Sequence, residues 1–480
     1  MLSYISQNMR VHKTLTVQRE VGTVKRFFQR ILLLGVLLLV MLAGTGCSGL
    51  PKLTLNPQDL YCLPKLPTKY TELNNLLNQI VEGGAEFAAP TSGTNIQTVQ
   101  MMDLNGDGND EALAFFRNSA DEKPLKIYIF TADGDSYEQS AVIEGSGTSI
   151  YSIEYSDLDG DGRIELLVGW KVSEALQALS VYTLRPTGTE ELIRSTDYVK
   201  YKAEDLNQDQ RKELVVIHAD SVGNGIADYY GWQAGGLAVE SSARISMNMA
   251  ELSGQQGRVA SGALKDGTPA LFVTGVGESA RAITDILVMK DKEFTNIVLS
   301  AVTGVSTEIS LFRSLFPTDI NGDGVTEVPW PVPLPTWDDE EGSYQRIEWR
   351  AYDINGQSEA VLNTYHAIED GWYLRLPESW DGQILVSRNA APGETSVTFY
   401  ALSESGEPAE AFLRITAITG NDRENRAVRG NRFSLKRWEE TIYVAELLEG
   451  NERWNDGITE DEVRAAFSLI DTEWVSGDNY

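Results

Sequence analysis

Residues 157–168 read Asp-Leu-Asp-Gly-Asp-Gly-Arg-Ile-Glu-Leu-Leu-Val, and this stretch decides the fold because it recurs along the chain. Related stretches begin at Asp103, Asp205 and Asp319, each with oxygen-bearing side chains at alternate positions and a glutamate at the ninth. The starts lie 54, 48 and 114 residues apart. The last interval is about two periods, so a degenerate copy is expected near residue 262.

The expected copy is present as Gly262-Ala263-Leu264-Lys265-Asp266-Gly267, which keeps the Asp-Gly turn before the apolar run 270–273 but lacks the acid set. Each of the five units contains about four short runs with strand-like alternation, separated by Asp/Gly-rich turns. Four-stranded units at a fixed period are typical of β-propeller blades, in which radial closure protects the strand edges. We therefore predict a mainly β fold: a propeller of about five four-stranded blades over residues 96–368, followed by a small α+β domain at 369–480. The alternative is that the C-terminal strands supply further blades.

Two amphipathic helices are expected outside the repeats. Residues 70–81 have apolar side chains at helical spacing, and we assign residues 70–95 to this helix and a lead-in. A second helix is expected near the C-terminus, with a capping box and one apolar face. Its defining residues are Thr459, Glu462, Val463, Phe467 and Ile470.

The N-terminus has the pattern of an export signal. A basic segment at residues 25–30 precedes the apolar run Ile31–Ala43, which is short for a membrane span. Small residues then precede Cys47, an arrangement that resembles a bacterial lipoprotein signal. The resemblance implies that residues 1–46 are removed, that Cys47 is lipidated, and that 47–69 are a tether. The protein would then be exported and anchored to the bacterial cell membrane; the alternative is an uncleaved membrane anchor.

The composition narrows the range of partners. The formal net charge is −30, which repels nucleic acid and anionic lipid, so no nucleic-acid partner is expected. An acidic surface suits divalent cations and cationic partners. The chain has three histidines and two cysteines, which argues against multi-imidazole mechanisms and against a disulfide framework.

The repeated loops have the donor pattern of a cation site. Side-chain oxygens at positions 1, 3, 5 and 9 of a tight loop converge on one point, and position 7 adds its backbone carbonyl. Carboxylate-rich, flexible loops of this kind favour Ca²⁺ over Mg²⁺, and we expect three to four structural calcium sites. The predicted ligands are Asp103, Asn105, Asp107, Asn109 and Glu111; Asp157, Asp159, Asp161, Arg163 and Glu165; Asp205, Asn207, Asp209, Arg211 and Glu213; Asp319, Asn321, Asp323, Val325 and Glu327.

Position 12 excludes an EF-hand, which requires a bidentate glutamate there. The chain has Ala114, Val168, Val216 and Trp330 at this position, and a strand rather than a helix follows each loop. Loops of this type, repeated at blade spacing, resemble the FG-GAP/VCBS repeat family over residues 96–368. The resemblance implies calcium-binding loops on β-propeller blades, as in integrin α-subunits.

The loop at 205 departs from the family pattern, because Gln208 and Gln210 replace both glycines. Position 6 often needs a positive φ, so Gln210 is expected to strain the turn. The alternative for all the loops is that side-chain-to-backbone hydrogen bonds close them as ordinary turns without an ion.

The sequence supplies no convincing catalytic set. His218 is interpreted as a strand-end residue, and the cluster Trp337-Asp338-Asp339-Glu340-Glu341 as core and solvated loop rather than a binding site. We expect the metal to stabilise loops rather than catalyse. The first hypothesis is a cell-surface, non-enzymatic binding or adhesion module with an extracellular protein or glycan partner. The alternatives are a polysaccharide-active enzyme that uses propeller-face carboxylates, and a structural subunit of an envelope complex.

Overall fold

The computed structural model describes residues 71–470 with short gaps at 134–135, 234–235, 255, 278–281, 311–314, 336–343 and 404–407. The expected signal peptide, Cys47, the tether and the Trp337 to Glu341 cluster all lie outside the described residues. Among the helices in the described part of the chain, none is long and apolar enough to cross a membrane.

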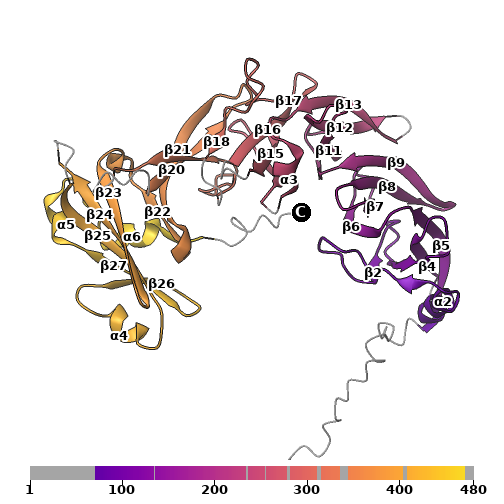
Figure 1. The fold of residues 1–480 in the computed structure, drawn as a ribbon, viewed down its shortest axis with the longest axis horizontal. Coiled ribbons are helices and arrows are strands. Elements are labelled where there is room, and N and C mark those ends of the chain that lie inside the picture. The colour runs from indigo at the N-terminus through magenta and orange to yellow at the C-terminus, as the bar shows by residue number, and fades with distance from the viewer. Residues whose placement is uncertain are drawn as a thin grey trace, which may run out of the picture. The chain divides into compact units, whose positions relative to one another are not determined.

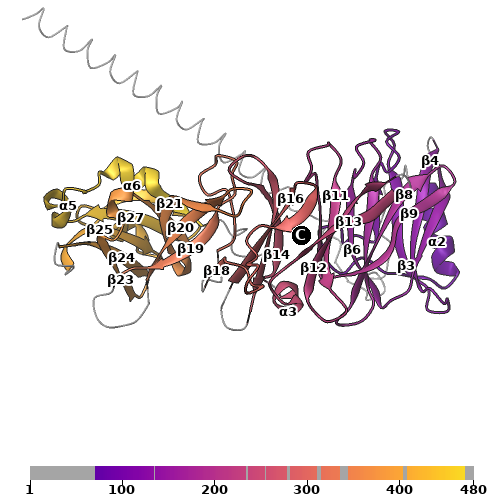
Figure 2. The same cartoon turned by 90° about the horizontal axis from the view of Figure 1, so that it is seen from above.

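The described residues form six antiparallel sheets that follow one another in chain order (Figures 1 and 2). The first sheet contains β1 (Glu86–Phe87), β2 (Val99–Met102), β3 (Glu111–Arg117), β4 (Leu125–Asp133) and β5 (Ser136–Gly145). The second contains β6 (Ser149–Ser156), β7 (Glu165–Lys171), β8 (Gln177–Arg185) and β9 (Gly188–Tyr198). The third contains β10 (Lys200–Glu204), β11 (Glu213–Ala219), β12 (Gly225–Gln233) and β13 (Gly236–Arg244).

The remaining three sheets each contain five strands. The fourth contains β14 (Arg258–Ala263), β15 (Pro269–Val276), β16 (Ala282–Lys290), β17 (Glu293–Asn296) and β18 (Ile309–Ser310). The fifth contains β19 (Val328–Pro333), β20 (Gln345–Tyr352), β21 (Ser358–Ala367), β22 (Trp372–Leu376) and β28 (Phe467–Leu469). The sixth contains β23 (Ile384–Ala391), β24 (Glu394–Leu402), β25 (Pro408–Ile418), β26 (Phe433–Trp438) and β27 (Thr441–Leu447).

The strands β3, β7, β11 and β15 are apolar on both faces. They follow the acidic stretches that begin at residues 103, 157 and 205 and the degenerate copy near residue 262. In β7, Leu166 and Val168 lie in the core shared with the first sheet, whereas Leu167 lies in the core shared with the third. Successive side chains of a strand point to opposite faces, so a continuous apolar run requires both faces to be covered. The same burial pattern recurs in β3, β11 and β15.

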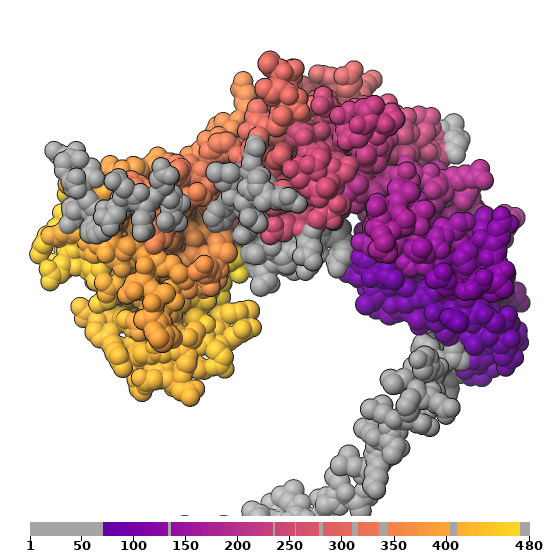
Figure 3. All heavy atoms as spheres, in the orientation of Figure 1, coloured from indigo at the N-terminus to yellow at the C-terminus, as the bar shows by residue number. Residues whose placement is uncertain are grey.

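The larger hydrophobic cores therefore lie between two consecutive sheets. One cluster joins sheets one and two, and further clusters join two and three, three and four, four and five, and five and six. Figure 3 shows the same succession on the surface, where the colours of neighbouring sheets follow chain order. The predicted mainly β architecture is confirmed, and within the described residues no strand of the first sheet pairs with a strand of the last.

The helices are short. They are α2 (Thr71–Glu82), α3 (Met249–Ser253), η3 (Ile368–Asp370), η4 (Glu378–Trp380), α4 (Arg423–Ala427), α5 (Glu449–Arg453) and α6 (Glu460–Ala466). Some connect strands of one sheet, as η3 and α4 do. The helix α2 confirms the expected N-terminal helix and buries Leu73 and Leu77. In α6 the predicted capping box is present, with Thr459 accepting from the N–H of Glu462.

The predicted face of the C-terminal helix is wrong beyond Ala466. Phe467 begins β28, which pairs with β22 and therefore completes the fifth sheet with a strand from the end of the described chain. The ring of Phe467 packs against Trp372 at 5.7 Å and Tyr443 at 5.6 Å between centroids. These tertiary contacts and the sheet edge outweigh the helical periodicity. The strand β22 also extends the fifth sheet beyond residue 368.

His366 on β21 makes the stability of the fold depend on pH in the acid range. Its imidazole is buried, stacks on Tyr373 with 5.0 Å between ring centroids, and has Nε2 2.9 Å from Oγ1 of Thr364. Burial lowers the pKa of His366 from its ordinary value of 6.5 to about 3, so protons bind the unfolded chain preferentially. The neutral ring thus contributes its full stability above pH 6.5, and this contribution is lost as the pH falls towards 3.

We predict that His366→Phe makes thermal stability less sensitive to acid between pH 6.5 and 4 than in the unmodified chain. The measurement is the melting temperature as a function of pH for both proteins. Parallel curves across this range would show that His366 is not held neutral by the fold.

Candidate functional site

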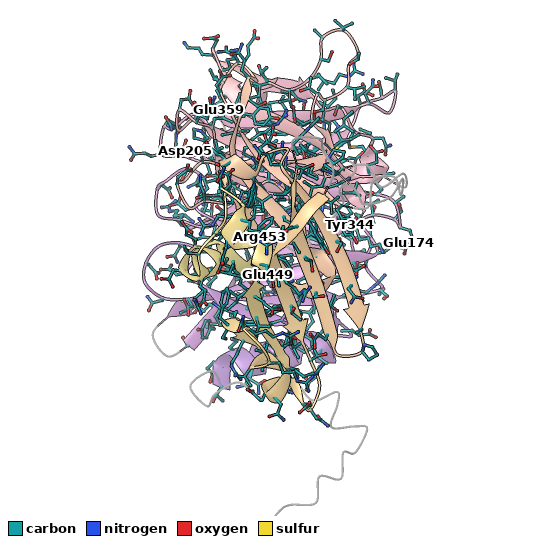
Figure 4. All side chains as sticks on the ribbon, turned by 90° about the vertical axis from the view of Figure 1, so that its left-hand side faces the viewer. Glu174, Asp205, Tyr344, Glu359, Glu449 and Arg453 are labelled. Carbon is teal, nitrogen blue, oxygen red and sulfur yellow. The ribbon has the colours of Figure 1, made fainter. Side chains whose placement is uncertain are left out.

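Four acidic loops occupy equivalent places in the fold, immediately before strands β3, β7, β11 and β19. We name them by their first residue: the 103, 157, 205 and 319 loops. The first three connect β2 to β3, β6 to β7 and β10 to β11. Before the 319 loop the first strand is reduced to a single bridge between Thr318 and Glu327. Figure 4 labels Asp205, the first residue of the 205 loop, at an edge of the molecule in that view.

The glutamate at position 9 anchors each loop from inside the protein. It is almost completely buried, although it bears a carboxylate. Its Oε2 accepts the backbone N–H of position 2, whose Leu or Ile side chain is buried in a core. These bonds are Leu104 to Glu111 at 2.8 Å, Leu158 to Glu165 at 2.9 Å, Leu206 to Glu213 at 3.0 Å and Ile320 to Glu327 at 3.1 Å.

The shorter side chains organise the exposed part of each loop. The Asp at position 1 accepts the N–H of position 6, and the Asp at position 5 accepts the N–H of position 7, in all four loops. The first set is Gly108 to Asp103, Gly162 to Asp157, Gln210 to Asp205 and Gly324 to Asp319. The second set is Asn109 to Asp107, Arg163 to Asp161, Arg211 to Asp209 and Val325 to Asp323. The loops are therefore closed by side-chain-to-backbone hydrogen bonds, which are compatible with both interpretations of the sequence.

The backbone at positions 4 and 6 has a positive φ in every loop, which glycine adopts without strain. Gln208 and Gln210 nevertheless adopt φ values of 62° and 72° at these positions of the 205 loop. This confirms the expected strain, because a side chain in the left-handed region costs about 1–2 kcal/mol.

Neighbouring loops are also bonded to one another. The N–H at position 8 donates to the carbonyl at position 2 of the preceding loop: Ile164 to Leu104 at 3.0 Å, and Lys212 to Leu158 at 2.7 Å. The backbones approach so closely that a Cβ at Gly106 would lie 2.7 Å from the carbonyl oxygen of Gly162. The loops are thus a connected row along the edges of successive sheets.

The 157 loop brings three carboxylates close together. Ligand oxygens of Asp157, Asp159 and Glu165 all lie within 4.8 Å of one another. Burial raises the pKa of Glu165 to about 7, and repulsion from Asp159 and Asp161 adds to this. In the 103 and 205 loops position 3 is Asn, and its amide donates to the glutamate Oε1 at 2.8 Å, which relieves the same repulsion.

The 319 and 205 loops differ in the carboxylate oxygens that they offer a cation. In the 319 loop Oε1 of Glu327 is buried without a hydrogen-bond partner, and burial raises the pKa of this carboxyl to about 7. In the 205 loop Arg211 binds Asp209 at 2.9 Å, which lowers the pKa of that carboxyl. An oxygen donor set with an unpartnered buried carboxylate oxygen fits a hard cation, and the arginine makes the 205 loop the poorest of the four.

The degenerate copy is the turn between β14 and β15. The N–H of Leu264 donates to the carbonyl of Thr268 at 2.9 Å, which replaces the glutamate anchor. Leu264 remains fully buried, as position 2 is in the other loops. This turn therefore keeps the packing residue while it lacks the acid set.

His218 lies at the end of β11, with Nε2 2.8 Å from Oδ2 of Asp228. Ser242 donates to the other oxygen of the same carboxylate at 2.6 Å, so the serine is bonded to the aspartate rather than to the imidazole. A nucleophile and its base must instead be hydrogen-bonded to each other. His218, Asp228 and Ser242 therefore form a hydrogen-bonded cluster rather than a nucleophile paired with its base.

A cavity of about 210 Å³ lies against the first strands of the second and third sheets. Its walls include Tyr151 and Glu154 of β6, Lys200 and Tyr201 of β10, and Tyr198. The sequence interpretation missed this group, because each residue has the pattern of an ordinary half-buried strand position. It lies apart from the acidic loops, none of which contributes to its lining.

One family model matches part of the chain. A model described as FG-GAP-like repeat matches residues 103–168, which contain the 103 and 157 loops with the strands between them. No curated protein matches the chain.

Among solved structures, a candidate 6-phosphogluconolactonase from Bacteroides uniformis is 13% identical with a TM-score of 0.24, covering 61% of this chain and 79% of its own. An α-L-arabinofuranosidase from Lactobacillus brevis is 8% identical with a TM-score of 0.25, covering 65% of this chain and 92% of its own. Neither likeness supports an inference about activity.

We predict that Gln210→Gly stabilises the chain by about 1 kcal/mol, because glycine removes the cost of the left-handed backbone. The measurement is the free energy of unfolding in denaturant. The matched control is Gln97→Gly at an exposed position without a positive φ, which should destabilise through the entropy of the unfolded chain. Equal effects of the two substitutions would contradict strain at Gln210.

Proposed function

We propose that the protein is a cell-surface, lipid-anchored binding module without enzymatic activity, whose sheets are the blades of a β-propeller stabilised by calcium. The observation that carries the proposal is the fourfold recurrence of one loop with the same buried glutamate anchor and the same bonds at positions 1 and 5. The family match over residues 103–168 and the burial of both faces of successive four-stranded sheets support the propeller arrangement.

The buried carboxylates of the loops favour a bound calcium ion. Burying a carboxylate without a counter-charge is unfavourable, and the 157 loop holds three close together. A bound divalent cation would lower the pKa of these groups and accept their free oxygens, with positions 1, 3, 5 and 9 as side-chain ligands and position 7 as the carbonyl ligand. Because the protein supplies most of the ligands, the cation would stabilise the loops rather than act on a substrate.

Binding is favoured over catalysis by the composition of the cavity. Glycoside hydrolysis uses two carboxyl groups about 5 to 10 Å apart. Among the described residues that line the cavity, Glu154 is the single carboxylate. The geometry there suits recognition, and a rigid stack of sheets holds the recognition surface in place.

The calcium proposal predicts that a chelator lowers the melting temperature of the full chain and that added Ca²⁺ restores it. A ligand that binds only the native state stabilises it by about 2.7 kcal/mol per site at a hundred times its Kd. We expect Asp159→Asn to reduce the calcium-dependent shift, because the 157 loop holds the closest carboxylate group.

The control for this experiment is Glu138→Gln, which removes one negative charge at an exposed position of β5 away from the loops. It should leave the calcium-dependent shift unchanged. Identical melting temperatures with chelator and with calcium would contradict the calcium proposal.

The anchor proposal predicts that Cys47→Ser moves the full chain from the membrane fraction to the soluble exported fraction of a bacterial host. Lipidation requires the cysteine thiol, and serine removes it with almost no change in size. Fractionation followed by detection of the chain provides the measurement. Retention of the variant in the membrane fraction would indicate an uncleaved anchor instead.

A further inference from the structure

The cavity beside β6 and β10 has a fixed wall. The lead-in segment runs along the free edge of β6, where Ser92 donates its N–H to the carbonyl of Tyr151 at 2.8 Å. The side-chain amide of Asn95 donates to the carbonyl of Ile153 at 3.0 Å. A bulge between Ile150 and Ser152 interrupts the regular pairing of β6 with β7 at this point. The lining is thus set by backbone bonds between segments distant in sequence.

The cavity contains one acid and one base that are not paired with each other. Glu154 and Lys200 are both half-buried, and neither belongs to an ion pair within the described residues. Burial raises the pKa of Glu154, although Lys202, Lys212 and a hydrogen bond with Tyr201 oppose this shift in part, and burial lowers the pKa of Lys200. Ionisable groups in this condition beside a cavity mark a candidate binding site.

Aromatic rings and hydroxyl groups make up much of the remaining wall. Tyr198 and Tyr201 contact each other edge to face, with 5.2 Å between ring centroids, and Tyr151 lies beside them on β6. The polar lining includes Ser92, Thr94, Ser152 and Gln177. Groups of this kind both donate and accept hydrogen bonds, whereas tyrosine rings also offer an apolar face.

We propose that this cavity binds a sugar residue, whose hydroxyl groups pair with Glu154 and Lys200 and whose apolar ring face packs on the tyrosines. The inference rests on the proposed function as a binding module and assigns its ligand class. A wholly apolar ligand would give the half-buried ammonium of Lys200 no hydrogen-bond partner in place of water, which is costly. A phosphorylated ligand would meet a single lysine in a chain of net charge −30. A sugar hydroxyl can donate to the carboxylate and accept from the ammonium without bringing charge of its own.

The test is calorimetric titration of the full calcium-loaded chain with a neutral hexose panel, a hexuronic acid, a hexosamine and, as a negative panel, free amino acids. We expect at least one sugar to bind. Glu154→Gln and Lys200→Met should each weaken that binding by about tenfold or more, the loss expected for one hydrogen bond to a charged group. Comparison of the affinities for the hexuronic acid and the hexosamine then shows whether Lys200 or Glu154 contributes more to binding.

The matched controls are Glu138→Gln and Lys123→Met, which make the same changes at exposed positions outside the cavity. They should bind as the unmodified chain does. Melting temperatures of all four variants establish that they fold, and the two cavity variants lose half-buried charges that have no ion-pair partner, so we expect them to remain folded. Absence of sugar binding, equal binding by cavity and control variants, or binding of amino acids in place of sugars would each overturn the inference. The calcium-dependent melting shift of the same samples reports on the proposed calcium-stabilised module independently.

Discussion

The repeated unit depends on one hydrogen bond, which the backbone N–H at position 2 donates to the buried glutamate at position 9. This bond closes the loop over the buried side chain at position 2. The glutamate that accepts the bond lies where the following strand begins. The bond is made at 2.8 to 3.1 Å in all four complete loops. Its acceptor is a carboxylate withdrawn from water, so the geometry that organises the loop also creates the local need for positive charge.

The sheets in turn depend on one another because β3, β7, β11 and β15 have two apolar faces. A strand such as β7 cannot bury both faces against one partner sheet, so each sheet between the first and the last is covered on both sides by its neighbours. The acidic loops lie at strand ends, whereas the cavity lies against β6 and β10. The acidic loops and the cavity are therefore placed in different parts of the structure, and a change in one need not disturb the other.

Much of this organisation was predictable from the sequence because it is periodic and local. The spacing of the acidic stretches located the degenerate turn at Leu264, and glycine chemistry identified the strained backbone at Gln210. The prediction failed at Phe467, where periodicity favoured a helix but contacts with Trp372 and Tyr443 hold a strand. The cavity could not be predicted either. Glu154 and Lys200 are far apart in the sequence, and only the approach of two sheets brings them to one wall.

The bond from position 8 of one loop to position 2 of the preceding loop makes the unit complementary to itself, head to tail. The 157 loop donates to the 103 loop and accepts from the 205 loop in this way, so this unit presents matching backbone groups to the units on either side of it. A backbone bond also joins the 319 loop to the turn at Leu264: the N–H of Thr326 donates to the carbonyl of Ala263 at 2.9 Å, although that turn lacks the acid set. The backbone connection between neighbouring units therefore does not require the acidic side chains.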